Sequence, residues 1–457
     1  MTAGFVWTDA EVRVALGLRA DLAEPQIVYT GVSTDSRSIA EGALYVALAG
    51  DRFDGHDFVA DAMSRGAAGA VVSRQPSSSA GARLYPVGDT LVALGSLAAH
   101  RRRSLGVPVV AITGSSGKTT TKDLTAAALA ADRRVHATRG NLNNRIGMPL
   151  TLLSTPDDVE AVVLELGSNE PGEIGILAQI ARPDIGVITT VGESHLEKLG
   201  SLEGVLEEKL DLLRSVASGG RCVVGDDPEE LVRHARGICP GVRVAGWTER
   251  ADSGLRPAEA DVDVFGCYRF RWKGQAVTLP LPGRHAVSDA MIALSVAELL
   301  GVSPAHAARG LESAETNPLR GEVRQIGDLT VIVDCYNANP QSVRAALDLL
   351  EGQGVAARRV AVLGTMLELG AESDRLHEET LADALSRDVQ LVVATGGFSG
   401  AAMRLGRCDE DRVLCAGDWK EAYPRLRERL NGGEVVLLKA SRGVALEGIL
   451  PLLEGEG

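Results

Sequence analysis

The residues best suited to chemistry lie in the stretch AITGSSGKTTTKDL, residues 111–124. The apolar residues before it (PVVA) indicate a buried strand, and TTTKDLTAAALAA indicates a helix. A glycine-rich turn of this kind holds an anion, because backbone N–H groups and the helix N-terminus face it, a lysine neutralises it and a threonine hydroxyl reaches Mg²⁺. The pattern predicts a phosphate-binding loop for a nucleotide, made of Gly114, Ser115, Ser116, Gly117, Lys118, Thr119 and Thr120.

Two further polar residues follow predicted strands of the same region. Glu165 ends the strand VEAVVLELG, and His195 lies in the loop GESHLE after DIGVITTV. Ligands of parallel α/β sheets bind beyond the carboxyl ends of the strands, so we expect Thr119, Glu165 and His195 to share one location. Hydroxyl, carboxylate and imidazole groups together suit Mg²⁺ or Mn²⁺. Taken alone, Glu165 could be a helix-entry charge and His195 a solvated loop side chain.

Lys209 is unusual because it is a charged residue on an apolar helix stripe. It falls among the apolar positions of the segment SLEGVLEEKLDLLRSV, residues 201–216. In one interpretation its amine reaches the surface and pairs with Glu207 or Asp211. In the other the amine is partly buried and desolvation lowers its pKa. A neutral amine can react with CO₂ to give a carbamate, which is an anionic metal ligand.

Composition excludes several classes of protein. The 457 residues leave room for two to four domains, and 45% apolar with 24% charged residues is typical of globular proteins. No apolar run is long enough to span a membrane, and the N-terminus does not resemble a signal peptide, so we expect a cytoplasmic protein without membrane insertion. A net charge of −14 and 4% aromatic residues argue against a nucleic-acid binder.

The six cysteines form no C-x-x-C pair, which favours reduced thiols packed as small hydrophobes. They are Cys222, Cys239, Cys267, Cys335, Cys408 and Cys415.

Strand and helix patterns alternate in three blocks, which we take as domains: 1–104, 105–318 and 319–457. The first ends in the helix pattern DTLVALGSLAAHRRRSL, and the second includes an antiparallel ribbon, DVDVFGCYRFRWKGQAVTLPLPG. We predict an α/β fold with a smaller N-terminal α/β domain, a central phosphate-loop domain and a C-terminal Rossmann-like domain. The central sheet is expected to be mainly parallel, with helices on both faces.

Nine motifs, in order and across nearly the whole chain, resemble those of the Mur ligases. They are STDSR (33–37), GALYVALAGDRFDGHDF (42–58), AITGSSGKTTTK (111–122), GNLNNRIGMPLTLL (140–153), ELGSNEPGEI (165–174), HLEKLGSLEGVLEEK (195–209), DCYNANPQSVRAALDLL (334–350), LGTMLELGAESDRLHEE (363–379) and LKASRG (438–443). YNANP and MLELG…LH resemble the subgroup that adds D-alanyl-D-alanine to UDP-N-acetylmuramoyl-tripeptide. The resemblance implies ATP-dependent amide formation through an acyl phosphate in peptidoglycan precursor synthesis, with two Mg²⁺ ions, in a monomer. An acyl phosphate must be kept from water, so domain closure is expected.

The resemblance also implies roles for single residues. Lys118 would hold the transferred phosphate, and Thr119 and Glu165 would bind one Mg²⁺. His195 would hold the second metal together with a carbamylated Lys209. Further ATP contacts would be Asn143, Asn144, Arg320, Asp334 and Asn337. The uridine nucleotide would contact Thr34, Asp35, Ser36 and Arg37.

Four positions depart from the family pattern. Ala286 and Asp289 stand where the motif GRHNxxN, near adenine, has asparagines. Asn offers a base edge a donor and an acceptor, whereas Ala offers neither and Asp only accepts. Thr365 and Ala440 replace an Asp and a Gly of the C-terminal motifs. The sequence leaves open how adenine is held and whether the tripeptide carries diaminopimelate or lysine.

Other functions stay open at this point. A phosphotransferase or GTPase-like switch would explain the phosphate loop but not Lys209 in an apolar stripe. A non-catalytic sugar-nucleotide binder or an altered-substrate homologue would explain the missing asparagines. Another amino-acid ligase of the same family is a further alternative.

Overall fold

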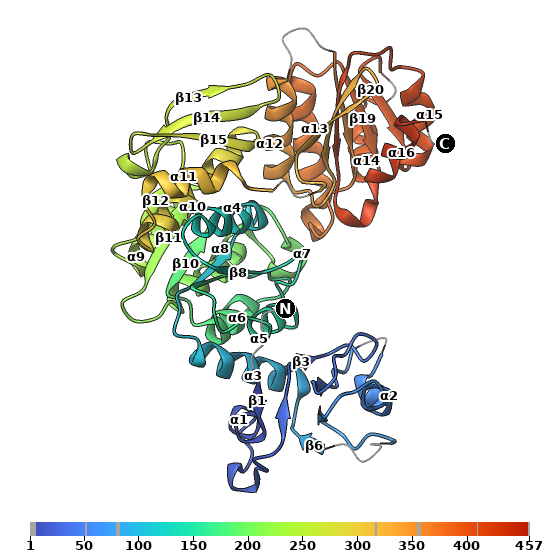
Figure 1. Ribbon diagram of the computed structural model, residues 1–457. Helices are drawn as coiled ribbons and strands as arrows, with labels where there is room; N and C mark the ends of the chain where they lie inside the picture. Colours follow the sequence, from blue (N-terminus) through green and yellow to red (C-terminus); the bar gives the residue numbers. More distant parts are fainter. Residues whose placement is uncertain are drawn as a thin grey trace.

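The computed structural model describes residues 6–50, 53–78, 83–315, 318–353, 358–408 and 410–455. Three α/β parts follow one another along the chain and in space (Figure 1), each with its own sheet. The predicted fold class is confirmed, because the central and C-terminal sheets are mainly parallel and a smaller α/β part precedes them. The boundaries at 104/105 and 318/319 stay predictions.

The N-terminal part, blue in Figure 1, is built on a four-stranded parallel sheet in the order β3-β4-β5-β6. Its strands are β3 (Val32–Ser33), β4 (Leu44–Val46), β5 (Gly69–Val72) and β6 (Arg83–Pro86), and a two-stranded pair joins β1 (Trp7–Thr8) to β2 (Val28–Tyr29). Its helices are α1 (Asp9–Ala15), α2 (Val59–Ser64) and α3 (Thr90–Ser104). Residues 75–82 (QPSSSAGA), whose composition is typical of a short loop, lie partly outside the described residues. The helix α3 begins where the Asp89 carboxylate accepts from the amides of residues 91 and 92.

The central sheet has six parallel strands in the order β12-β11-β10-β7-β9-β8. They are β7 (Val109–Thr113), β8 (Val135–Ala137), β9 (Ala161–Glu165), β10 (Ile185–Ile188), β11 (Arg221–Gly225) and β12 (Arg243–Ala245). Their helices are α4 (Lys118–Ala130), α5 (Gly147–Leu153), α6 (Glu173–Ala181), α7 (Leu196–Leu199), α8 (Leu202–Arg214), α9 (Glu229–Ile238), α10 (Arg284–Leu299) and α11 (Pro304–Glu312).

Helices cover both faces of this sheet, as predicted, because successive side chains of a strand point to opposite faces. On β7, Val110 and Ile112 pack with α4, α10 and α11 in one buried cluster. Val109 and Ala111 pack with α3, α5 and α6 in another. The predicted ribbon is a three-stranded antiparallel sheet of β13 (Ala258–Val262), β14 (Cys267–Trp272) and β15 (Gln275–Pro282).

The C-terminal part has a six-stranded sheet in the order β16-β17-β21-β18-β19-β20, parallel except for the edge strand β16. The strands are β16 (Glu322–Ile326), β17 (Leu329–Asp334), β18 (Arg359–Leu363), β19 (Leu391–Thr395), β20 (Val413–Ala416) and β21 (Val435–Lys439). The helices are α12 (Pro340–Gly352), α13 (Ser373–Ser386), α14 (Gly397–Arg404), α15 (Trp419–Arg427) and α16 (Leu450–Leu453).

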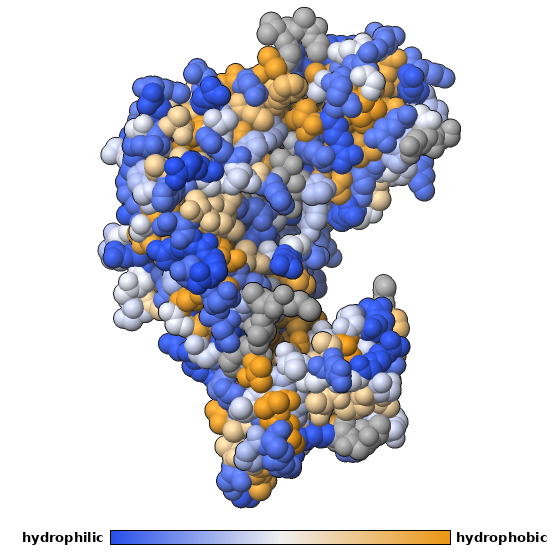
Figure 2. Space-filling view, in the orientation of Figure 1, coloured by the Kyte–Doolittle hydropathy of each residue, from blue (hydrophilic) through white to orange (hydrophobic). Residues whose placement is uncertain are grey.

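The central and C-terminal parts share buried apolar residues. One cluster runs without interruption from Leu196 and Val205 of the central part to Val343 and Met366 of the C-terminal part. Figure 2 shows these two parts in contact, with an open recess between the C-terminal and N-terminal parts on the visible face. The central and C-terminal parts are therefore packed against each other, whereas the N-terminal part stands apart from the C-terminal part.

The interpretation of all six cysteines as free thiols is wrong for one pair. Cys408 and Cys415 form a disulfide, with Cα atoms 5.7 Å apart, that joins the loop after α14 to β20. A spacing of seven residues gave no signal for this, because only the return of the chain into β20 brings the two together. The other four cysteines are free, as expected. Among the described residues, no helix has both the length and the apolar character needed to cross a bilayer.

Candidate active site

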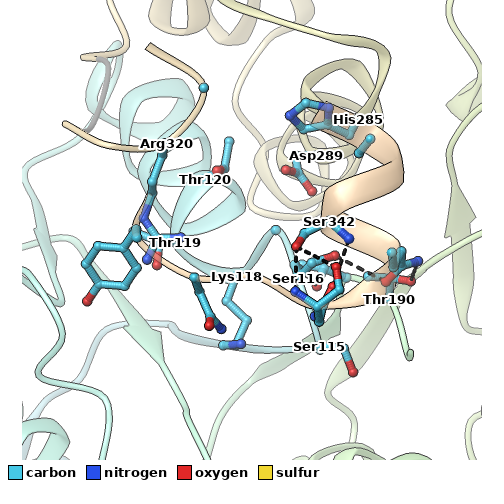
Figure 3. Close-up of a pocket in the computed structure, with 18 of the residues that line it drawn as sticks. Ser115, Ser116, Lys118, Thr119, Thr120, Thr190, His285, Asp289, Arg320 and Ser342 are labelled. Carbon is cyan, nitrogen blue, oxygen red and sulfur yellow. Dashed lines mark hydrogen bonds between the residues drawn. The ribbon is translucent and has the colours of Figure 1, made fainter. Parts of the chain in front are cut away.

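A cavity of about 660 Å³ lies between the central and C-terminal parts, at the carboxyl ends of the central strands. It gathers most of the residues that the sequence analysis singled out for nucleotide and metal. These are Ser115, Ser116, Gly117, Lys118, Thr119, Thr120, Asn143, Asn144, Glu165, His195, Arg320, Asp334 and Asn337. Residues of the two parts, some 200 positions apart in sequence, thus face one space (Figure 3).

The phosphate loop has the local geometry that its sequence predicts. Gly117 precedes α4 with φ +76°, a left-handed conformation that favours glycine. A Cβ at Gly117 would also lie 2.5 Å from Asp289 Oδ1, so this position has no room for a side chain. Gly114 does not line the cavity, but its carbonyl accepts a hydrogen bond of 2.7 Å from Lys118 Nζ. Burial lowers the pKa of Lys118, and the positive charge of Arg320 lowers it further against the opposing effect of Glu165.

Thr119, Glu165 and Asn143 meet at the carboxyl end of β9. The Thr119 hydroxyl donates to Glu165 Oε2 at 2.8 Å, and the Asn143 amide donates to Glu165 Oε1 at 2.7 Å. Hydroxyl and carboxylate oxygens are hard ligands, so this pair fits a Mg²⁺ that also contacts phosphate. Within the described residues, no three His, Cys, Asp or Glu side chains cluster as a metal site. Any metal here would therefore need the Thr119 hydroxyl, a modified lysine or substrate oxygens.

His195 lines the same cavity, with its backbone in a left-handed conformation of φ +54°. Its Nδ1 lies 2.6 Å from Oε2 of Glu368, which comes from the C-terminal part. The hydrogen bond from His195 holds the pKa of the Glu368 carboxyl below its usual range. His195 is thus an ordered site residue and not a freely solvated loop side chain.

Lys209 is buried in α8, as the second interpretation of its helix stripe requires. Its side chain is 1% exposed, and Nζ donates to Ser168 Oγ at 2.8 Å. Burial, with the charge of Lys118, lowers the pKa of Lys209 to about 7. Lys209 does not itself line the cavity, but its partner Ser168 does. The other interpretation, in which the amine reaches the surface and pairs with Glu207 or Asp211, does not hold, because Arg214 pairs with both carboxylates.

The C-terminal part contributes positive charge and a carboxylate. The Arg320 guanidinium lies 3.9 Å from the centre of the Tyr336 ring, which supports it at the cavity. Asp334, the last residue of β17, pairs at 2.7 Å with Lys439, the last residue of the neighbouring β21. Lys439 was not among the predicted site residues, although the strand-end rule used for the central sheet applies equally to this one.

Gln341, at the start of α12, bridges the two parts and was also missed. Its amide nitrogen donates to Thr190 Oγ1 at 2.8 Å, and its oxygen accepts from Ser116 Oγ at 3.3 Å. In Figure 3, dashed lines mark hydrogen bonds in the region of Ser116, Ser342 and Thr190. Only the tertiary structure could identify Gln341, because its partners lie 151 and 225 residues away.

Asp289, one of the two departures from the asparagine pattern, lies at the base of the phosphate loop. Oδ1 accepts a 3.0 Å hydrogen bond from the Thr121 hydroxyl, while Oδ2 is buried without a partner among the described residues. Burial raises the pKa of Asp289 to about 8. Near neutral pH the carboxyl is therefore protonated, and it can donate as well as accept a hydrogen bond. Ala286, the other departure, is buried in the core.

The predicted uridine contacts are far from this cavity in sequence and line none of it. Residues 34–37 follow β3 in the N-terminal part, where Arg37 pairs with Asp35 at 2.8 Å and Ser36 is buried. The ion pair holds the pKa of Asp35 down, to about 2. Residues 34–37 are therefore separate from the cavity between the central and C-terminal parts.

The fold and the cavity define a three-part nucleotide-binding protein whose phosphate loop faces a second α/β part. Family models match in the same order: "Mur ligase family, catalytic domain" over 28–102, "Mur ligase middle domain" over 112–297 and "Mur ligase, glutamate ligase domain" over 319–442. The chain belongs to the Mur ligase family.

The chain is similar to several members of the family over almost their whole length. The chain is 37% identical to a Bacillus subtilis UDP-N-acetylmuramoyl-tripeptide–D-alanyl-D-alanine ligase, with 96% of each chain covered. It is 32% identical to the Escherichia coli protein of that name, over 96% of this chain and 97% of the other. A crystal structure of MurF from Acinetobacter baumannii matches with a TM-score of 0.91 and 30% identity, covering 99% and 100%. The structure of MurF ligase from Thermotoga maritima in complex with ADP matches with a TM-score of 0.81 and 28% identity. The match covers 93% of this chain and 97% of the other.

Proposed function

We propose that this protein is an ATP-dependent ligase that joins D-alanyl-D-alanine to UDP-N-acetylmuramoyl-tripeptide in peptidoglycan precursor synthesis. The terminal carboxylate of the tripeptide attacks the γ-phosphorus of ATP, which gives an acyl phosphate and ADP. The amine of the dipeptide then attacks the acyl carbonyl, and phosphate leaves the tetrahedral intermediate. The products are the amide, ADP and phosphate.

One observation carries this proposal: Lys118 and Arg320, from two different parts of the molecule, face one cavity. Two cations beside the backbone amides of a phosphate loop suit a triphosphate, whose charge must be neutralised during phosphoryl transfer. The phosphate loop alone does not distinguish a ligase from a switch or a phosphotransferase. The second cation on a separate α/β part favours an enzyme that closes around ATP and shields an acyl phosphate from water.

Thr119 and Glu165 would hold one Mg²⁺, and His195 with a carbamylated Lys209 would hold a second. Bound Mg²⁺ would supply neutralising charge for the transferring phosphoryl group. The lowered pKa of Lys209 supports carbamylation, because only the neutral amine reacts with CO₂. Forming the carbamate lengthens the side chain beyond the amine, which at present ends at Ser168. Asn143 orients the Glu165 carboxylate, and Asp334 with Asn337 would contact the nucleoside.

The N-terminal part would hold the uridine nucleotide through residues 34–37. The open recess in Figure 2 then gives the sugar-peptide room to extend toward the ATP cavity. We keep the two domain boundaries, a monomeric state and a cytoplasmic location as predictions.

The test is an assay of phosphate release with ATP, Mg²⁺, UDP-N-acetylmuramoyl-tripeptide and D-Ala-D-Ala, run with the diaminopimelate and lysine tripeptides in parallel. We expect release that requires both the tripeptide and the dipeptide, with a matching amount of amide product. Release without the dipeptide would indicate an ATPase instead. No release in any mixture would favour a sugar-nucleotide binder.

A further inference from the structure

We propose that Glu368 of the C-terminal part is a positioning residue for His195, and that it orients the imidazole for metal only when the two parts are closed. This inference rests on the proposed role of His195 as a metal ligand. It assigns a task to a residue that does not line the ATP cavity.

The contact between the two side chains is short and directional. His195 Nδ1 and Glu368 Oε2 are 2.6 Å apart, a distance typical of a hydrogen bond to an ionised acceptor. A carboxylate that accepts from one ring nitrogen fixes the tautomer and leaves the other nitrogen as a ligand. Here Nδ1 is engaged, and Nε2 makes no hydrogen bond with any described residue. Nε2 is therefore the nitrogen left for a cation in the cavity that His195 lines.

The backbone around Glu368 is docked on the same loop. The amide of Glu197 donates to the carbonyl of Glu368 at 3.1 Å. Gly370 has φ +57°, and a Cβ there would lie 2.8 Å from the Cα of Glu197. Any larger residue would push the two loops apart, so the close approach depends on glycine.

Both residues of the pair adopt left-handed backbone conformations, with φ +54° at His195 and +64° at Glu368. Such conformations are costly for residues with a side chain and persist where the surroundings enforce them, often at functional sites. The two loops therefore hold the carboxylate and the imidazole in a conformation that neither would favour alone.

Apolar packing secures the loops beside the polar contact. Met366 and Leu369 flank Glu368, and Leu196 and Leu199 lie in α7 after His195; all four are buried in one cluster. The packing holds the two loops close enough for the hydrogen bond between Glu368 and His195 to form. Because the carboxylate comes from the C-terminal part, opening the two parts would remove it and free the imidazole to change tautomer.

The first test needs no metal. Histidine-selective ¹⁵N labelling reports the tautomer of His195 in the metal-free protein, with His195→Gln used to assign its signals. We expect the Nδ1–H form in the unmodified protein and a marked shift toward the Nε2–H form in Glu368→Ala. Glu372→Gln is the matched control, because Glu372 is on the same segment but pairs with Arg375 at the surface. An unchanged tautomer in Glu368→Ala would overturn the proposal.

The second test measures Mn²⁺ binding by electron paramagnetic resonance with ADP present and no turnover. We expect Glu368→Ala to weaken one class of bound Mn²⁺ about 10–100-fold, and Glu368→Gln, which keeps an acceptor, to weaken it less. His195→Ala should lose the same class, and Glu372→Gln should keep it. Unchanged or tighter binding in Glu368→Ala, with loss in His195→Ala, would overturn the role of Glu368. Undiminished binding in His195→Ala would instead overturn the metal role of His195 on which the inference rests.

Discussion

At the scale of single residues, burial decides the chemistry of two ionisable groups beside the cavity. Lys209 and Asp289 are both buried near the phosphate loop, and desolvation favours the neutral form of each. An amine that is partly neutral at physiological pH can be modified by CO₂. A carboxyl that is protonated there can act as a hydrogen-bond donor.

Lys209→Ala should abolish ligation and regain part of its activity when a short-chain carboxylate is added, because the added anion can replace the carbamate. Phosphate release measured with increasing acetate or formate checks this. Lys198→Ala is the control, since Lys198 is exposed and pairs with Glu170. Full activity of Lys209→Ala without added carboxylate would contradict the carbamate role.

Asp289→Asn should change how stability depends on pH. In the folded protein the pKa of Asp289 is about 8, against 3.8 for the exposed group. Between these values the folded state binds more protons than the unfolded state, so stability falls as pH rises, by up to about 1.4 kcal/mol per pH unit. Denaturant unfolding should show that the free energy of unfolding falls less between pH 6 and pH 8 for Asp289→Asn than for the unmodified protein. Equal losses would show that Asp289 does not carry this titration.

At the scale of elements, the phosphate loop depends on the start of α4 being packed against α10. Gly117 provides the left-handed turn, and Asp289 of α10 lies directly against it. The conformation of the phosphate loop therefore depends on the helix α10 as well as on the loop sequence, because Asp289 leaves no space for a side chain at position 117.

Gly117→Ala should destabilise the protein by about 1–3 kcal/mol, through backbone strain and the contact with Asp289. In the double variant Gly117→Ala/Asp289→Ala the clash should be relieved while the backbone strain remains. A double-mutant cycle measured by denaturant unfolding therefore separates the cost of the clash from the cost of the strain. Gly274→Ala is the control, because Gly274 has a similar φ of +79° with open space around it. Equal effects at Gly117 and Gly274 would argue against the clash.

At the scale of the whole molecule, the central and C-terminal parts are held together by few polar contacts and a shared apolar cluster. Gln341 joins α12 to Ser116 and Thr190, and Glu368 joins its loop to His195, directly before α7. Both contacts end at residues that would touch nucleotide or metal. Closure and ligand binding are therefore expected to be linked.

Gln341→Ala should let the C-terminal part separate from the central part in the nucleotide-free protein, because two interdomain hydrogen bonds, each worth about 0.5–1.5 kcal/mol, are lost. Small-angle X-ray scattering should show a larger radius of gyration. Gln325→Ala provides the control, since Gln325 bonds only within its own hairpin. A radius of gyration unchanged by Gln341→Ala would contradict the prediction.

The sequence by itself determined the fold class, the phosphate loop and the grouping of Thr119 with Glu165. These follow from local patterns, because strand ends and glycine turns have geometries that neighbouring residues fix. Burial of Lys209 was one of two interpretations that the helix spacing allowed, and the packing of α8 decided between them. The roles of the site residues stay predictions that the shared cavity supports.

Only the tertiary structure revealed Glu368 and Gln341 as neighbours of the site, the ring nitrogen that His195 keeps free, and the Cys408–Cys415 disulfide. Each of these contacts depends on which surfaces of different helices, strands and loops pack against one another. That meeting is set by packing between residues that can be far apart in the sequence, and local spacing carries no signal for it.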